Sequence, residues 1–134
     1  MKHTLLIIAA FLFITSAVFP QSKMNINNLV EYGDKKYAPN DDEPYTGKVF
    51  DFYENGQKKL DGRYRKGLMT GKWTYYHENG QKKYERTYKD GKNDGLGTWW
   101  HENGQKSSER TWKDGERISS KCWDEDGKEM DCPW

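Results

Sequence analysis

The chain has no excess of either charge. Over its 134 residues, 22 basic side chains stand against 21 acidic ones, and from Gln21 onward the two numbers are equal. Proteins whose main partner is a nucleic acid usually carry a strong basic excess, so nucleic acid is not expected as a partner. The same balance weakens a purely electrostatic attraction to anionic lipid.

Aliphatic side chains are also scarce. From Gln21 to the end, the chain has 31 apolar residues, and 17 of them are Phe, Trp or Tyr. This leaves too little aliphatic material for a thick globular core. The composition fits a thin structure in which large aromatic side chains with polar tips provide most of the burial.

Only one long hydrophobic run is present. Leu5–Ile14 lies between a short basic start and the small residues Thr15-Ser16-Ala17. This order is typical of a secretory signal peptide, which we assign to residues 1–20. A retained N-terminal anchor is the alternative, although a membrane span needs roughly 20 apolar residues. We therefore expect a protein that is exported and is periplasmic or secreted.

Cysteine is rare, and Cys122 and Cys132 are the only two. In an exported chain, two cysteines near one end favour a disulfide over a metal site. A two-residue turn at Asp126-Gly127 would place Asp131 opposite Cys122 and leave Cys132 one step away. The bridge therefore requires a wider loop or a bulge, and an unbridged pair is the alternative.

Repetition is what the chain has in abundance. The sequence Glu-Asn-Gly-Gln-Lys occurs at residues 54–58, 78–82 and 102–106, which are 24 residues apart, and a weaker copy occurs at 125–128. A fixed period of this size indicates a repeat protein. A second glycine turn recurs with the same period, at residues 65–67, 89–91 and 113–115. Because glycine interrupts the chain too often for helices, each repeat is predicted to be a β-hairpin with a return connection.

The Asn-Gly pair of each copy favours a two-residue type I′ hairpin turn. Since side chains alternate between the two faces of a strand, this turn also decides which aromatic residues share a face. The same register sets a glycine opposite an aromatic ring in each repeat. In the second repeat, the predicted pairs are Gly71 with Tyr88, Trp73 with Arg86, Thr74 with Glu85, Tyr75 with Tyr84 and Tyr76 with Lys83.

These observations predict an all-β fold, an elongated antiparallel meander of stacked β-hairpin repeats with a period of about 24 residues. We expect a capping segment at residues 21–44 and the array at residues 45–134. The array is divided into repeats 45–70, 71–94, 95–119 and 120–134.

The residues Tyr45-Thr46-Gly47-Lys48, the segment 53–59 and the segment 64–67 resemble the MORN-repeat variant, and the pattern recurs in the second repeat. The chain is similar in particular, over roughly residues 29–132, to bacterial proteins labelled as YwqK-family antitoxins of toxin–antitoxin systems. The resemblance implies a binding scaffold without catalytic machinery. Together with the signal peptide, it implies that a toxin partner would be exported too.

The surplus aromatic residues are the candidate binding residues, because Trp and Tyr are enriched at binding hot spots. The alternative is that they only stabilise the array. Lysines that follow each turn form a second candidate, a basic rail along one edge, and their alternative role is to block unwanted strand pairing. The aromatic candidates are Trp73, Tyr75, Tyr76, Trp99, Trp100 and Trp112, and the lysines are Lys58, Lys59, Lys82, Lys83 and Lys106.

Catalytic and metal-binding constellations are lacking in the sequence. His77 and His101 stand at equivalent positions of neighbouring repeats, and the first repeat has Tyr53 there, so we interpret them as solvated residues beside a turn. The serines have no His and Asp constellation nearby. We expect no enzymatic activity, no cofactor and no metal.

The leading hypothesis is therefore a non-enzymatic, exported repeat scaffold that binds a protein partner, an exported toxin being one form of it, through its aromatic sheet face. The alternative hypothesis is an envelope binder of phospholipid headgroups or cell-wall glycans, since aromatic repeats with lysines occur in such binders.

Overall fold

The computed structural model describes residues 22–133, so the signal peptide expected at residues 1–20 lies outside the described residues. The described chain is built almost entirely of β-strands, as predicted. Its elements are β1 (Lys23–Asn25), the 3₁₀ turn η1 (Ile26–Asn28), β2 (Val30–Tyr32), β3 (Lys35–Tyr37), β4 (Gly47–Phe52), β5 (Lys58–Arg65), β6 (Leu68–Met69), β7 (Gly71–Tyr76), β8 (Lys82–Lys89), β9 (Lys92–Asn93), β10 (Gly95–Trp100), β11 (Lys106–Lys113), β12 (Glu116–Trp123) and β13 (Glu129–Met130).

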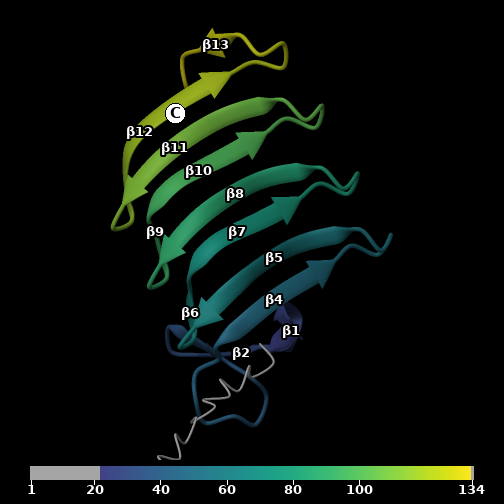
Figure 1. The fold of residues 1–134 in the computed structure, drawn as a ribbon, viewed down its shortest axis with the longest axis vertical. Helices are drawn as coiled ribbons and strands as arrows, with labels where there is room; N and C mark the ends of the chain where they lie inside the picture. The colour runs from purple at the N-terminus through teal and green to yellow at the C-terminus, as the bar shows by residue number, and fades with distance from the viewer. Residues whose placement is uncertain (1–21, 134) are drawn as a thin grey trace, which may run out of the picture.

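The strands form one long twisted sheet in the order β1-β4-β5-β7-β8-β10-β11-β12-β13, with β6 and β9 extending the ends of β5 and β8. All neighbours are antiparallel except β1, which pairs parallel to β4. The hairpins stack along the long axis, and their turns alternate between the two long edges (Figure 1). The predicted open meander of stacked hairpins is confirmed. The parallel edge strand β1 was not foreseen.

The predicted register is confirmed through the body of the first three hairpins. In the second repeat, Trp73 lies opposite Arg86, and Tyr75 lies opposite Tyr84. The glycine and ring pairs also form, with Gly71 opposite Tyr88 and the equivalent pairs in the first and third repeats. One predicted pair is wrong, because Tyr76 lies opposite Lys82 rather than Lys83.

The turn explains that error. The Asn-Gly turn is not type I′, since Gly80 has a φ of 87° but Asn79 is not among the residues with positive φ. A three-residue turn is closed instead by two hydrogen bonds, from the His77 amide to the Gln81 carbonyl at 2.8 Å and from the Gly80 amide to the His77 carbonyl at 3.0 Å. A bulge between Tyr75 and Tyr76 then restores the predicted register. Turns of this kind are the next most common hairpin connection.

Type I′ geometry occurs at the opposite edge. Lys66 and Gly67 have φ values of 49° and 79°, and the Asp-Gly pairs at 90–91 and 114–115 are equivalent. The turns at Gly91 and Gly115 also link neighbouring repeats, and the turn at Gly67 is bonded to the start of its own repeat. The amides of Gly67, Gly91 and Gly115 donate to the carbonyls of Tyr45, Met69 and Asn93, at 2.8, 3.0 and 2.9 Å.

The Asn-Gly turns stack on one another in a similar way. The Asn55 side-chain amide donates to the Glu78 carbonyl of the next turn at 3.0 Å, and Asn103 repeats this contact with Glu125. The same asparagine accepts a hydrogen bond within its own turn, from the amide of Gln57 at 2.9 Å. The recurring sequence therefore both closes each hairpin and attaches it to the next.

The thickest part of the core lies at the N-terminal end of the sheet. Val49, Leu60, Tyr64 and Trp73 are buried there together with Tyr45, and partly buried residues of the N-terminal segment pack against them. That segment contains β1, η1 and the β2–β3 hairpin, which forms a separate two-stranded sheet. The residues of the segment in this cluster are Met24, Ile26, Leu29 and Ala38. The boundaries of the expected capping segment and repeats stay a prediction.

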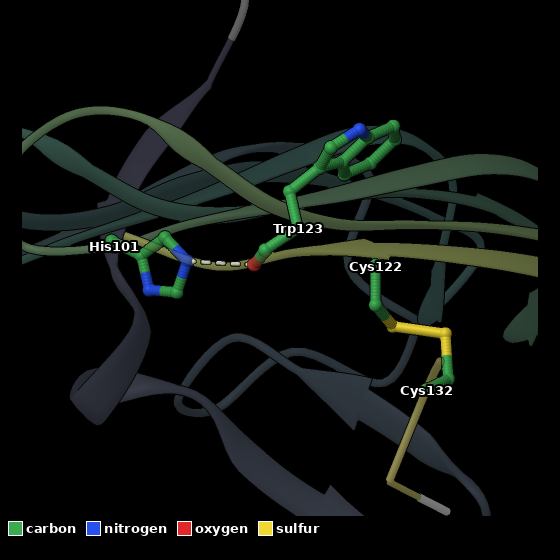
Figure 2. Close-up of a disulfide and its surroundings, with 4 residues drawn as sticks. All are labelled: His101, Cys122, Trp123 and Cys132. Atoms are coloured by element: carbon green, nitrogen blue, oxygen red, sulfur yellow. Dashed lines mark hydrogen bonds between the residues drawn. A yellow bond between two sulfur atoms is a disulfide. The ribbon is translucent and has the colours of Figure 1, made fainter. Parts of the chain in front are cut away.

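The fourth hairpin is the last one within residues 22–133. The predicted Cys122–Cys132 disulfide forms, with the two Cα atoms 5.3 Å apart (Figure 2). The wider loop that the bridge requires is again a three-residue turn, which pairs Cys122 with Met130 rather than with Asp131. Cys132 thus lies just beyond the short strand β13 and is bonded back to β12.

Candidate binding surface

The long sheet has two chemically different faces. The face that we call the aromatic–arginine face carries Trp73, Tyr75, Tyr84, Arg86, Trp99, Arg110 and Trp112. The opposite face, which we call the lysine face, carries Lys58, Tyr76, Lys82, Trp100, Lys106 and Trp123. The division follows from the alternation of side chains along each strand. The bulge beside each Asn-Gly turn interrupts this alternation and brings Lys58, Lys82 and Lys106 to the lysine face.

Aromatic rings form a continuous row along the aromatic–arginine face. The ring centroids of Tyr75 and Tyr84 are 4.3 Å apart in a stacked pair. Tyr84 and Trp99 follow at 6.1 Å, and Trp99 and Trp112 at 5.6 Å. These separations lie in the range of favourable aromatic contacts, so the row connects two consecutive repeats.

Two arginines lie within this row. The Arg86 guanidinium carbon is 5.2 Å from the centroid of the Tyr84 ring and 5.0 Å from that of Trp99. That of Arg110 is 4.5 Å from the Trp99 centroid. Burial, together with the positive charges of Arg117 and Arg86, lowers the pKa of Arg110. Positive charge is therefore concentrated among aromatic rings at the C-terminal half of this face.

The N-terminal end of the same face is covered. Trp73 is 0% exposed, and its indole lies against the backbone of Gly62, where an added Cβ would come within 2.3 Å of the ring. The indole nitrogen donates to the Arg63 carbonyl at 3.1 Å. Trp73 therefore belongs to the core. Tyr84, Trp99 and Trp112 are only half-buried and lie outside the cluster that the N-terminal segment packs against.

The lysine face repeats a different unit, which includes three of the five lysines of the predicted basic rail, Lys58, Lys82 and Lys106. One lysine of each repeat pairs with an acidic residue three positions later and also lies over an aromatic ring of the next repeat. Such paired ammonium groups leave little net charge for a partner. The units are Lys58 with Asp61 and Tyr76, Lys82 with Glu85 and Trp100, and Lys106 with Glu109 and Trp123.

The first repeat adds a shallow groove of about 450 Å³ to the lysine face. Phe50 and Phe52 line it, and Phe52 is 49% exposed. Its rim is mainly basic, with Lys23 5.1 Å from the centroid of the Phe50 ring. The basic side chains are Lys23, Lys48, Lys58, Arg63 and Lys72, and the acidic one is Asp61.

His101 contacts the next repeat, and a ring nitrogen of His77 is buried, so neither histidine is simply solvated. The imidazole Nε2 of His101 lies 3.0 Å from the carbonyl oxygen of Trp123, so this nitrogen carries the hydrogen (Figure 2). At the equivalent place, the Tyr53 hydroxyl donates to the Tyr76 carbonyl at 2.7 Å. Nε2 of His77 is buried without a hydrogen-bond partner. No cluster of three or more His, Cys, Asp or Glu side chains suited to a metal ion occurs within residues 22–133.

The structure thus divides the sequence-predicted binding residues. It brings Trp73, Tyr75, Trp99 and Trp112 to one face and places Tyr76 and Trp100 on the other. Sequence reasoning missed the Phe50–Phe52 pair and Arg110 as members of candidate surfaces. The spacing of 24 residues between Arg86 and Arg110, on second strands of consecutive repeats, was the available signal.

These features define a β-hairpin repeat array in which both faces carry periodic side chains. Its repeats match the MORN repeat variant at residues 45–66, 69–90 and 93–114, and the chain therefore carries three copies of that repeat. No curated protein matched the sequence, and no solved structure did. Within the described part of the chain, no helix is long and apolar enough to cross a membrane.

Proposed function

We propose that this protein is a non-enzymatic scaffold that acts after export and binds a protein partner through the C-terminal half of its aromatic–arginine face. The single observation that carries the proposal is the uncovered part of the aromatic row. Half-buried Tyr84, Trp99 and Trp112 lie there with Arg86 between them. Trp, Tyr and Arg are the residues that most often dominate protein interfaces.

Repeat arrays commonly act as extended binding surfaces, and this supports a scaffold over an enzyme. The N-terminal sequence supports export. An exported toxin is the partner that the resemblance to YwqK-family antitoxins suggests.

Affinity capture from periplasmic and secreted fractions of the bacterium that makes the protein tests this proposal. Trp99→Ala and Trp100→Ala form a matched pair, because the two residues are adjacent on β10 and point to opposite faces. Each is expected to cost ~2 kcal/mol of stability, since each side chain is half-buried. Only Trp99→Ala is expected to abolish capture of the partner. Equal capture by the wild type and a folded Trp99→Ala protein would refute the proposed surface.

The groove on the lysine face favours a second candidate, an envelope binder of phospholipid headgroups or cell-wall glycans. Its basic rim and exposed Phe52 suit an amphipathic, anionic ligand. Co-sedimentation with anionic liposomes and with peptidoglycan tests it. Binding that is lost in Phe52→Ala and kept in Trp99→Ala would favour this candidate over the protein partner.

A further inference from the structure

The hairpin of the fourth repeat has a short second strand. In the first three repeats, the second strand of the hairpin (β5, β8 or β11) has eight residues. It pairs with the first strand (β4, β7 or β10) along the whole length of that first strand. In the fourth repeat, the first strand β12 is eight residues long, but β13 has only two residues and pairs only with Cys122 and Trp123.

One edge of β12 is therefore open. Its other edge pairs with β11 along nearly its full length. Among residues 22–133, no strand lies beside the outer edge of Glu116–Lys121, and all six of these residues are exposed. A strand edge of this kind presents unpaired amide and carbonyl groups and serves as a template for a further strand. The disulfide fixes β13 at one end of this edge and so limits how far the edge extends.

The side chains near this edge indicate what charge an added strand should carry. Arg117 lies opposite Trp112, and Ser120 lies opposite Arg110, so both belong to the aromatic–arginine face. The glutamates of these last strands lie on the lysine face instead, where Glu109 is opposite Lys121 and Glu116 is opposite Lys113. The C-terminal end of the aromatic–arginine face thus carries Arg86, Arg110 and Arg117 with no carboxylate contributed by β8, β10, β11 or β12.

We propose that the open edge of β12 binds an extended, acidic segment of a protein partner as an added antiparallel strand. The segment pairs with β12 in the way that β11 pairs with β10. Its carboxylates face Arg117 and the arginines next to it. Six residues of strand span about 20 Å. This inference rests on the proposed function in one respect, since it takes the partner to be a protein.

Charge also decides against a second copy of the chain at this edge. Two β12 strands paired antiparallel about a two-fold axis would continue the same face of the sheet. They would bring the three arginines of each copy onto one surface and supply no carboxylate to either set. Main-chain hydrogen bonds provide the affinity of strand addition and the alternating side chains provide its specificity, so an acidic strand is the better complement.

A synthetic peptide tests the edge without the natural partner. The probe has the sequence of Glu109 to Lys113, the part of β11 whose equivalent place beside β12 is not occupied by β13, with glutamate at the positions of Arg110 and Lys113. The unaltered segment is the control peptide. The acidic peptide is expected to slow amide hydrogen exchange at residues 116–121 of the intact protein. Protection at another place, such as Phe50 to Phe52, or no protection at all, would overturn the proposal. So would a dimer whose β12 edge is already protected without peptide.

Charge reversal tests the contact to arginine. Arg117→Glu is expected to weaken binding of the acidic peptide about tenfold, and a peptide with arginine restored at the position of Arg110 is expected to recover it. Arg65→Glu is the matched control, because Arg65 is also an exposed strand arginine but lies at the far end of the array. Equal loss in both variants would show general charge attraction and would overturn the assignment to this edge.

A chain extension separates this inference from the proposed function. A Gly/Ser linker and the acidic strand are added after Trp134, so that the protein fills its own edge. This variant is expected to lose both peptide binding and capture of the natural partner. Capture that persists would overturn the edge proposal and leave the scaffold function standing. Edge protection by the peptide, with no partner recovered by the wild type, would instead count against the proposed function alone.

Discussion

At the scale of single residues, small and large side chains alternate across the boundaries between repeats. Trp73 lies over Gly62 of the preceding repeat, and the inter-repeat pairing of Leu60 with Tyr75 sets this position. At the next boundary, the roles are reversed. Here the glycine is on the following strand, where Gly97 lies opposite Arg86, and the rings of Trp112 and Trp99 pack against it. Each glycine thus leaves room for the aromatic rings that pack against it.

Gly62→Ala is the direct test of this fit. Gly62 does not have positive φ, so its replacement is not strained by backbone conformation. The new methyl group would meet a fully buried indole, and we expect a loss of ~3 kcal/mol in the free energy of unfolding. Gly56→Ala is the control, since Gly56 has a φ of 83° and open space around it, and it should cost ~1 kcal/mol. Urea denaturation measures both, and a Gly62 variant as stable as the control would contradict the assigned packing.

Glu85 is the most highly connected acid of the lysine face. Its carboxylate lies 2.9 Å from the Lys82 ammonium, 3.3 Å from that of Lys72 and 3.2 Å from the Thr74 hydroxyl. Burial alone would raise the pKa of Glu85. The hydrogen bonds and charges of Lys82 and Lys72 outweigh burial and bring the pKa below its ordinary value of 4.5.

A lowered pKa in the folded state means that ionised Glu85 stabilises the fold above the pKa of the unfolded chain. This contribution is lost as the pH falls below about 4.5 and through the folded pKa. We therefore expect Glu85→Gln to be less stable than the wild type at pH 7 and to lose less stability on acidification. Thermal unfolding between pH 7 and pH 3 measures this, with Glu116→Gln, on the exposed part of β12, as control. Parallel pH curves for the wild type and the Glu85 variant would rule out the linkage.

At the scale of elements, the disulfide holds the shortest strand in place. β13 pairs only with Cys122 and Trp123, so without Cys132 it has little to keep it on the sheet. Closing a loop of this size is worth about 2–3 kcal/mol in the chain-entropy model. Because β13 is peripheral, we expect the loss to appear as local opening rather than as unfolding of the array.

Cys132→Ser is accordingly expected to speed amide exchange at Glu129 and Met130 by roughly 100-fold, the factor that corresponds to this free energy. Exchange in β7 and β8 should stay unchanged and serves as the internal control. If exchange rises equally throughout the sheet, the disulfide stabilises the whole array and the local account fails.

Sequence periodicity predicted the hairpins and their register, because a side-chain period of two and a repeat of 24 leave few alternatives. The disulfide was predicted from the presence of only two cysteines near one end of a chain expected to be exported. It did not predict the turn type. The type I′ turn falls at Lys66-Gly67 and its equivalents, whereas the Asn-Gly turns have three residues and a compensating bulge. Both arrangements give the same register beyond Tyr75, so the pattern of strand residues could not distinguish them.

The pairing of the lysines and the burial of Trp73 could not be predicted from the sequence either. Lys82 reaches Glu85 on its own strand and Trp100 in the next repeat, which depends on how far one hairpin is displaced from another. Trp73 belongs to the buried cluster against which the N-terminal segment packs, and that segment has no periodicity to fix its place. The structure was therefore needed to identify which aromatic residues remain accessible.

At the scale of the whole molecule, the repeats are alike in backbone but are not interchangeable. Each hairpin is stabilised by its neighbours, as in other linear arrays. In the sheet, however, Trp73 needs a glycine on the preceding strand, and Trp99 and Trp112 need the glycine that lies opposite Arg86 on the following strand. The order of side chains along the array is thus specified at each boundary.

Inserting a second copy of residues 71–94 after Asp94 tests this specification. The insertion preserves the period of 24 and every turn, but it places the new tryptophan opposite Arg86 of the original copy, where Trp73 has Gly62. We expect the longer array to fold with a larger m-value, since it buries more surface. Its boundary should be strained by an amount similar to other overpacked sites, ~2 kcal/mol.

Arg86→Gly in the original copy should relieve that strain, because it recreates the pairing of glycine with tryptophan. The same substitution in the chain of natural length should be destabilising, since it removes a guanidinium that lies within 6 Å of the Tyr84, Trp99 and Trp112 ring centres. One substitution is thus expected to have opposite signs in the two backgrounds, and such a reversal measures the coupling between neighbouring repeats directly. A destabilising effect in both backgrounds would mean that the array tolerates any order of its hairpins.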